Sequence, residues 1–368
     1  MIIKRDYYLQ QLISSKSNNL IKIVTGIRRS GKSFLLFNLF HNHLTETGIS
    51  EDHIIEIALD DRLNKNLRDP DVILRHIHER IVDDKLYYII LDEVQMIDEF
   101  TDVLNSLLHI RNADVYVTGS NSKFLSKDVV TEFRGRGDEI HLFPLSFAEL
   151  YNSVGGDKFE LWKSYYTYGG LPGILELDSD KKKAAYLRSL HETVYLKDII
   201  ERNNLKNSED FMELMRVMAS CIGSPCNPSK LENTFKSVKN ETLDRKTISK
   251  YLSYMEDAFL IEKSMRYDIK GRKYIGTLSK YYFQDIGLRN ALLNFRQVEE
   301  NHIMENVIYN ELRLRGFCVD VGMVEARTAK ERKQLEVDFV ANMADRRYYI
   351  QSAFAMPDDA KREQECAS

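Results

Sequence analysis

The N-terminal part of the sequence alternates short apolar runs with amphipathic segments. The apolar runs predict buried strands, and the segments between them repeat apolar residues at helical spacing. Strands are expected at 21–24, 54–59, 87–91 and 114–118, and helices at 33–40, 71–82 and 100–110. This alternation predicts an α/β fold whose parallel sheet is covered on both faces, with the ligand at the carboxyl ends of its strands.

The pattern changes in the second half of the chain. Residues 159–204 carry apolar residues at helical spacing. After them, three further helix patterns are followed by two strand patterns. These helices are expected at 211–221, 228–235 and 244–256, and these strands at 260–265 and 281–283. Three helices followed by two strands is the order of a winged helix. The glycines at 169–173 mark either a hinge that senses nucleotide or a plain turn between helices.

Composition and charge narrow the class of protein. The chain has 368 residues, enough for two or three domains, with 29% charged and 43% hydrophobic residues, as in ordinary folded proteins. Its net charge of −4 predicts no global attraction to nucleic acid. No signal peptide or run of about 20 apolar residues is present, so the expected location is the cytoplasm, away from membranes. The scattered cysteines predict neither a zinc site nor a disulfide.

One motif follows the first predicted strand and opens the first predicted helix. It has the G-x-x-x-x-G-K-[ST] form of a phosphate loop, which binds a nucleoside triphosphate. Its residues are Gly26, Ile27, Arg28, Arg29, Ser30, Gly31, Lys32 and Ser33. The glycines let backbone N–H groups curl around the phosphates, Lys32 supplies a charge to the β- and γ-phosphates, and Ser33 offers a hydroxyl to Mg²⁺.

A pair of carboxylates follows the third predicted strand. Asp92 and Glu93 lie where a phosphate-loop ATPase has its second catalytic element. Asp92 is expected to hold the Mg²⁺ shell, and Glu93 to orient the attacking water or accept its proton.

Further candidates come after the strand that ends at Thr118. Ser120 or Asn121 is expected to sense the γ-phosphate or position the water, although both residues also suit the start of a helix. Arg136, or Arg134 as second choice, would stabilise the charge that grows on the γ-phosphate, and a solvated loop arginine is the alternative. An arginine that acts across a subunit boundary would require a homo-oligomer.

An ordered set of segments resembles the prokaryotic AAA-type ATPases that carry an AAA_14 domain and a C-terminal DUF4143 domain. These segments lie at 26–33, 89–95, 117–122, 142–150 and 168–172. The resemblance implies a cytosolic bacterial or archaeal ATPase, a winged-helix region and a nuclease-like C-terminal domain. The expected preference for adenine rests on this resemblance alone, because a phosphate loop contacts the phosphates of a nucleotide and not its base. Arg28 and Arg29 belong to the signature of the resembled family.

The third helix of the winged-helix pattern is basic. Arg245, Lys246 and Lys250 could meet a phosphate backbone, and the turn at 270–273 adds further basic residues. Residues 228–282 contain twelve Lys and Arg against seven Asp and Glu. Contact with double-stranded DNA is one interpretation of this pattern, and contact with a protein or packing against another domain is the other.

The C-terminal part resembles the restriction-endonuclease fold. A helix with Glu305 precedes strand patterns at 335–340 and 348–351, and Asp338 and Gln351 match two positions of the nuclease site. Ala353 stands where that site has its lysine, so nuclease activity is not expected. The chain stops before the last helix and strands of the fold, which suggests a truncated terminus with an open sheet edge.

Together these observations predict four regions and one primary function. The regions are an ATPase core (1–155), a helical lid or connector (156–205), a winged-helix domain (206–285) and an inactive endonuclease-like domain (286–368). The predicted function is ATP hydrolysis with Mg²⁺, which drives a conformational change. In one form of this prediction, the protein is bound to DNA when the change occurs. The alternatives are a nucleotide-gated switch that binds DNA or protein with little hydrolysis, and an ATP-dependent nuclease, which Ala353 disfavours.

Overall fold

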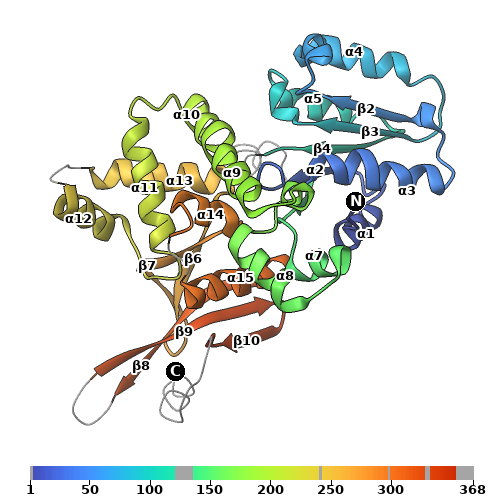
Figure 1. The fold of residues 1–368 in the computed structure, drawn as a ribbon. Helices are drawn as coiled ribbons and strands as arrows, with labels where there is room; N and C mark the ends of the chain where they lie inside the picture. Colours follow the sequence, from blue (N-terminus) through green and yellow to red (C-terminus); the bar gives the residue numbers. More distant parts are fainter. Residues whose placement is uncertain (1–2, 121–135, 240–242, 297–298, 328–331, 354–368) are drawn as a thin grey trace. The chain divides into compact units, whose positions relative to one another are not determined.

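The computed structural model describes residues 3–120, 136–239, 243–296, 299–327 and 332–353. The chain divides into two compact units, Met1–Gly155 and Gly156–Ser368 (Figure 1). The first unit is a parallel sheet between helices. The second contains a helical region and a mixed sheet.

The sheet of the first unit has five parallel strands in the order β2-β3-β4-β1-β5. Their bounds are β1 (Ile21–Thr25), β2 (Ile54–Ala58), β3 (Tyr87–Asp92), β4 (Ala113–Thr118) and β5 (Gly137–His141). The first four match the strands expected from the apolar runs. Strand β4 lies between β1 and β3, so the carboxyl ends of these three strands lie next to one another.

Helices cover both faces of this sheet (Figure 1). The helices of the first unit are α1 (Asp6–Ser14), α2 (Lys32–Phe34), α3 (His41–Glu46), α4 (Pro70–Arg80), α5 (Phe100–Leu107) and α7 (Phe147–Val154), with a π-helical stretch (Leu35–Phe40) between α2 and α3. The local sequence explains where several of these helices begin. The Asp69 side chain accepts from the N–H groups of Asp71 and Val72, with Pro70 at the first helical position. Ser146 and Glu149 form a reciprocal capping box at α7.

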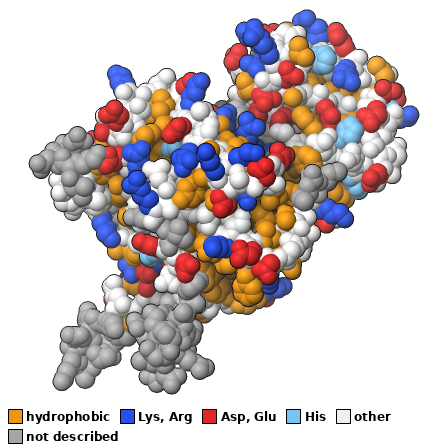
Figure 2. Space-filling view, viewed as in Figure 1, with side chains coloured by type: hydrophobic (Ala, Val, Ile, Leu, Met, Phe, Trp, Pro, Cys, Tyr) orange, Lys and Arg blue, Asp and Glu red, His pale blue; other side chains and the backbone are white. Residues whose placement is uncertain are grey.

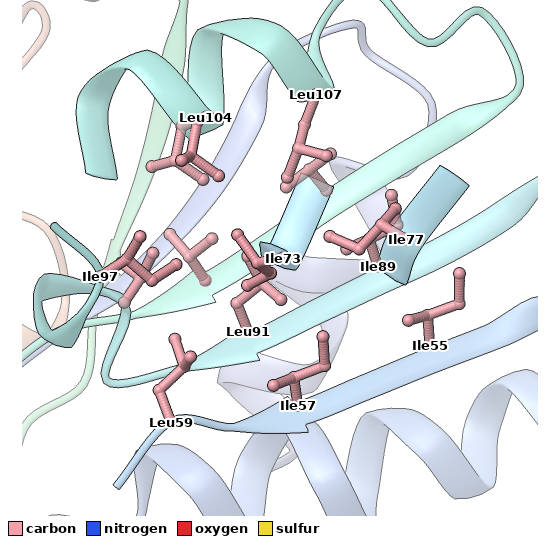
Figure 3. Close-up of a cluster of buried hydrophobic side chains, with 14 of the residues drawn as sticks. Ile55, Ile57, Leu59, Ile73, Ile77, Ile89, Leu91, Ile97, Leu104 and Leu107 are labelled. Carbon is pink, nitrogen blue, oxygen red and sulfur yellow. The ribbon is translucent and has the colours of Figure 1, made fainter. Parts of the chain in front are cut away.

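The strand pattern builds a separate apolar layer on each face of the sheet. In β3, Ile89 and Leu91 belong to one cluster, whereas Tyr88 and Ile90 belong to the other, because successive side chains point to opposite faces. Figure 3 shows Ile89 and Leu91 facing helical residues such as Leu104. Each such side chain contributes about 1.5–3 kcal/mol when it is fully buried. The sequence of a strand that is buried on both faces is therefore a continuous run of apolar residues.

The helices of the second unit come before and between its strands. They are α8 (Lys158–Tyr168), α9 (Asp180–Leu190), α10 (Lys197–Asn203), α11 (Ser208–Ser220), α12 (Pro228–Lys239), α13 (Arg245–Asp257), α14 (Ile286–Leu292) and α15 (Glu300–Leu314). A π-helical stretch (His191–Leu196) joins α9 to α10. The three helices expected between 211 and 256 correspond to α11, α12 and α13.

The two strands expected to form a wing are part of a larger sheet. That sheet has the order β10-β9-β8-β6-β7, with β6 and β8 parallel and its other neighbours antiparallel. Its strands are β6 (Ile261–Asp268), β7 (Lys273–Phe283), β8 (Cys318–Arg327), β9 (Arg332–Met343) and β10 (Arg346–Ile350). The expected boundary between 285 and 286 therefore runs through a shared sheet. A two-stranded hairpin is only marginally stable, and here β8 extends it.

The glycine-rich turn after α8 is fixed within the second unit. Buried Asp285 accepts hydrogen bonds from the N–H groups of Gly170 (2.8 Å) and Leu288 (2.9 Å). A Cβ atom at Gly287 would overlap the carbonyl oxygen of Tyr168, so only glycine allows this close approach. These contacts favour the plain-turn interpretation of this segment over the hinge.

Candidate nucleotide-binding site

The phosphate loop leaves β1 and enters α2 with a backbone that favours glycine. Gly26 has φ 138°, and a Cβ there would overlap the carbonyl oxygen of Leu142. Arg29 (φ 65°) and Gly31 (φ 98°) are both left-handed, and Gly31 precedes the first residue of α2. Left-handed residues in such a loop turn successive N–H groups toward one point and form an anion-binding concavity. The loop conformation therefore suits a phosphate.

Lys32 belongs to the phosphate loop, and its side chain contacts the first residues of that loop. Its side chain is buried, and Nζ donates to the carbonyl oxygens of Gly26 (3.0 Å) and Ile27 (3.1 Å). Burial lowers the pKa of Lys32 to about 8, although the nearby carboxylates of Glu93 and Asp92 oppose this shift. A phosphate group would strengthen the charged form in the same way that these carboxylates do.

Arg5 supports the phosphate loop from the N-terminal segment. Its buried guanidinium donates to the carbonyl oxygens of Ser30 (3.3 Å) and Phe143 (2.7 Å) and forms a 2.8 Å ion pair with Glu149 of α7. The guanidinium also lies 4.6 Å from the centre of the Tyr8 ring. Arg5 thus links the loop to α1 and α7, a role that the sequence analysis did not assign.

Asp92 and Ser33 form the oxygen-rich part of the site. A hydrogen bond joins the side chains of Asp92 and Ser33, and the Thr118 hydroxyl donates to Asp92. Burial raises the pKa of Asp92, while these two hydrogen bonds oppose the shift. No group of three His, Cys, Asp or Glu side chains suited to a metal occurs among the described residues. One hydroxyl and one carboxylate still fit Mg²⁺, which usually takes one or two protein oxygens, phosphate oxygens and water.

Glu93 has a left-handed backbone (φ 53°), which is uncommon for a residue with a side chain. Its N–H donates to the Thr118 hydroxyl (2.8 Å). Its Oε2 accepts from the Ser120 hydroxyl (3.0 Å) and from Nε2 of Gln95. Arg28 Nε in turn donates to the Ser120 hydroxyl (3.3 Å). A chain of hydrogen bonds therefore runs from the phosphate loop to the carboxylate of Glu93.

The structure brings together most of the residues selected from the sequence. Besides the loop itself, Asp92, Glu93 and Ser120 lie at the carboxyl ends of β3 and β4. Thr118 and Gln95 also belong to this network and were missed. The sequence signal that could have identified Thr118 is its hydroxyl side chain at the carboxyl end of β4, the strand that lies between β1 and β3.

The arginine candidates have a different outcome. Arg136 is exposed and precedes β5, and its carbonyl oxygen accepts from the N–H of Ile21 at the start of β1 (2.9 Å). The phosphate loop follows the other end of β1, roughly 15 Å away at about 3.3 Å a residue. The structure therefore does not bring Arg136 to the phosphate loop of its own chain, which leaves a solvated loop arginine or an action across subunits. Asn121 and Arg134 lie outside the described residues.

A second charged cluster lies in the sheet of the second unit. Lys280 Nζ is 2.7 Å from Glu305, 2.9 Å from Glu336 and 3.7 Å from Asp338. Asp338 also accepts from the N–H and hydroxyl of Ser352, both at 2.8 Å. The two positions expected for a nuclease site do meet, because the N–H of Asp338 donates to Gln351 (3.2 Å). A lysine ammonium, however, lies among the carboxylates that would hold a metal.

The basic residues of α13 lie on its exposed face. Arg245, Lys246 and Lys250 are exposed, whereas Ile248 and Leu252 are buried. Asp244 begins the helix by accepting from two N–H groups of its first turn. Figure 2 shows basic and acidic side chains mixed over the visible face of the molecule. A nucleic acid would therefore have to meet a local patch rather than a globally positive surface.

The sheet order, the phosphate loop on β1 and the carboxylates on β3 define a phosphate-loop nucleotide-binding protein with a strand inserted between β1 and β3. The family comparisons agree with this class. Residues 18–151 match the AAA domain AAA_14, and residues 159–299 match DUF8612, a domain of unknown function. The second domain therefore carries the designation DUF8612 rather than the expected DUF4143. Its match extends across the boundaries predicted at 205 and 285.

Two relatives extend over nearly the whole chain. An uncharacterized protein of Haemophilus influenzae is 33% identical over 97% of this chain and 88% of its own length. An uncharacterized protein of Methanocaldococcus jannaschii is 29% identical over 92% of this chain and 75% of its own length. The chain belongs to the same family as the H. influenzae protein, and it carries an AAA_14 domain followed by a DUF8612 domain.

Similarity to solved structures is weaker. The Pyrobaculum aerophilum Cdc6p is 13% identical, with 84% of this chain and 95% of that chain covered and a TM-score of 0.34. The Aeropyrum pernix Orc1 protein in complex with DNA is 11% identical, with 79% and 92% covered and a TM-score of 0.33. Among the helices of the described residues, none is long and apolar enough to cross a bilayer.

Proposed function

We propose that the protein hydrolyses ATP with Mg²⁺ and that the nucleotide cycle drives a conformational change. The observation that carries this proposal is the network around Thr118. Its hydroxyl contacts both Asp92 and Glu93, and Asp92 is in turn hydrogen-bonded to Ser33 of the phosphate loop. Phosphate-binding residues and two carboxylates with different surroundings thus meet at one edge of the sheet, as ATP hydrolysis requires.

Each residue has a distinct part in this proposal. The N–H groups of the loop and the Lys32 ammonium would hold the β- and γ-phosphates. Ser33 and Asp92 would hold Mg²⁺, which neutralises charge on the phosphates when it is bound. Glu93 would orient the attacking water and accept its proton, with Ser120 fixing the carboxylate.

Phosphate release from ATP tests this proposal. Lys32→Ala should abolish nucleotide binding, whereas Glu93→Gln should retain binding and lose turnover. Glu79→Gln, an exposed change in α4, is the matched control. Parent-like hydrolysis by Glu93→Gln would disprove the role of Glu93. Binding without phosphate release by the unaltered protein would instead support the nucleotide-gated switch.

We also propose that the exposed basic face of α13 binds duplex DNA. Arg245, Lys246 and Lys250 lie on that face, and a solvent-exposed stripe of this kind suits phosphate contacts. Lys246→Ala with Lys250→Ala should weaken DNA binding and reduce its dependence on salt. Equal binding by the parent and the double variant at low salt would exclude this surface. The nuclease alternative remains disfavoured by Ala353, which stands where the nuclease site has its lysine.

A further inference from the structure

Gln95 contacts the carboxylate of Glu93 from the short helical turn that follows β3. That turn covers Val94–Met96. The Nε2 of Gln95 donates to Oε2 of Glu93, the same oxygen that accepts from the Ser120 hydroxyl (3.0 Å). Two donors from different segments therefore converge on one oxygen, and in the described part of the chain no hydrogen bond reaches Oε1 of Glu93.

The other end of the Gln95 side chain is unfavourable for folding. Its Oε1 is buried and has no hydrogen-bond partner among the described residues. A buried acceptor without a donor lowers the stability of the folded state, and rotating the amide would turn its oxygen toward a carboxylate. Glu93 adds a second local cost through its left-handed backbone. Two unfavourable features in one turn indicate that the turn is arranged for the position of Glu93 rather than for stability.

We propose that Gln95 is a positioning residue for ATP hydrolysis. By occupying Oε2 together with Ser120, it orients the carboxylate of Glu93 so that Oε1 is presented to the attacking water. Arg28 contacts Ser120 (3.3 Å), so the same network carries the position of the phosphate loop to Glu93. This inference rests on the proposed ATPase function, and it assigns a role to a residue to which the sequence analysis gave none.

Gln95→Met tests the inference because methionine has a similar length and shape but neither the amide donor nor the unpaired oxygen. The melting temperature should stay unchanged or rise, and the Kd for ATP should stay within about twofold of the parent value. The kcat should fall at least about tenfold, as expected when a reacting group is held in the wrong orientation. Gln10→Met, an exposed change in α1, is the matched control.

A second measurement separates positioning from a structural role. Ser120→Ala removes the other donor to the same oxygen, so Gln95→Met and Ser120→Ala should not combine multiplicatively in kcat. A lower melting temperature for Gln95→Met, or a kcat within twofold of the parent, would overturn the assignment of Gln95 alone. Absence of phosphate release by the unaltered protein would overturn the proposed ATPase function and this inference together.

Discussion

The affinity for ATP is expected to fall as the pH rises above 8, because Lys32 then loses its charge. Burial lowers the pKa of Lys32 to about 8 in the protein, well below the usual value for a lysine. Bound phosphates favour the ammonium, so they raise this pKa and the complex takes up a proton from solution. At pH 9 about one lysine in ten remains charged, which weakens binding about tenfold relative to pH 7.

Isothermal titration at pH 7, 8 and 9 in buffers of different ionisation enthalpy measures both effects. The Kd should be nearly constant up to pH 8 and then rise, and the binding heat should depend on the buffer at pH 9. The phosphates of ATP are already ionised in this range, and burial raises the pKa of Tyr8, which lies against Arg5, to about 12, outside the range. Lys32→Arg is the control, since its guanidinium stays charged. A constant Kd and a buffer-independent heat from pH 7 to 9 would refute the role of burial at Lys32.

Three further predictions concern single side chains. Asp285→Ala should lower the free energy of unfolding by about 3 kcal/mol in a urea titration, because it leaves buried N–H groups, including that of Gly170, unpaired; a loss below about 1 kcal/mol would contradict this. Lys280→Met should cost about 3–5 kcal/mol at pH 7 by removing the cation among three carboxylates, and less at pH 5, because burial raises the pKa of Glu305 and favours its neutral form as the pH falls; equal losses would argue against an electrostatic cause. Thr118→Val should raise the Mg²⁺ concentration for half-maximal phosphate release about 10–100-fold, because Asp92 loses its donor; an unchanged Mg²⁺ dependence would exclude that role.

The first unit could be predicted well from the sequence because its signals are local. Strand β3 is a continuous apolar run, and the phosphate loop has a fixed spacing, so both could be located without tertiary information. The role of Thr118 could not be found this way. Its importance comes from the position of β4 between β1 and β3, which sets a strand end beside Asp92.

The second unit was harder because its sheet combines distant segments. The turn at 269–272 shows that β6 and β7 are neighbours, but nothing local shows that β6 also pairs with β8 in parallel, with Arg266 opposite Val321. Lys280 is a similar case. The strand expected at 281–283 begins one residue after Lys280, and the carboxylate partners of Lys280 lie on α15 and β9. Parallel pairing between distant strands has no short-range sequence signal comparable to a hairpin turn.

The fixed turn after α8 changes where a movement linked to the nucleotide can originate. Opening the chain at Gly170 would remove the hydrogen bond to buried Asp285 and separate the close contact between Tyr168 and Gly287. Gly155 and Gly156 differ in both respects. They have φ values of 68° and 91°, nothing lies within 4 Å of a Cβ built on either residue, and the division between the two compact units falls between them. Backbone rotation at Gly155 and Gly156 breaks none of the contacts that fix the turn at Gly170, so these two glycines are better suited to a hinge than that turn is.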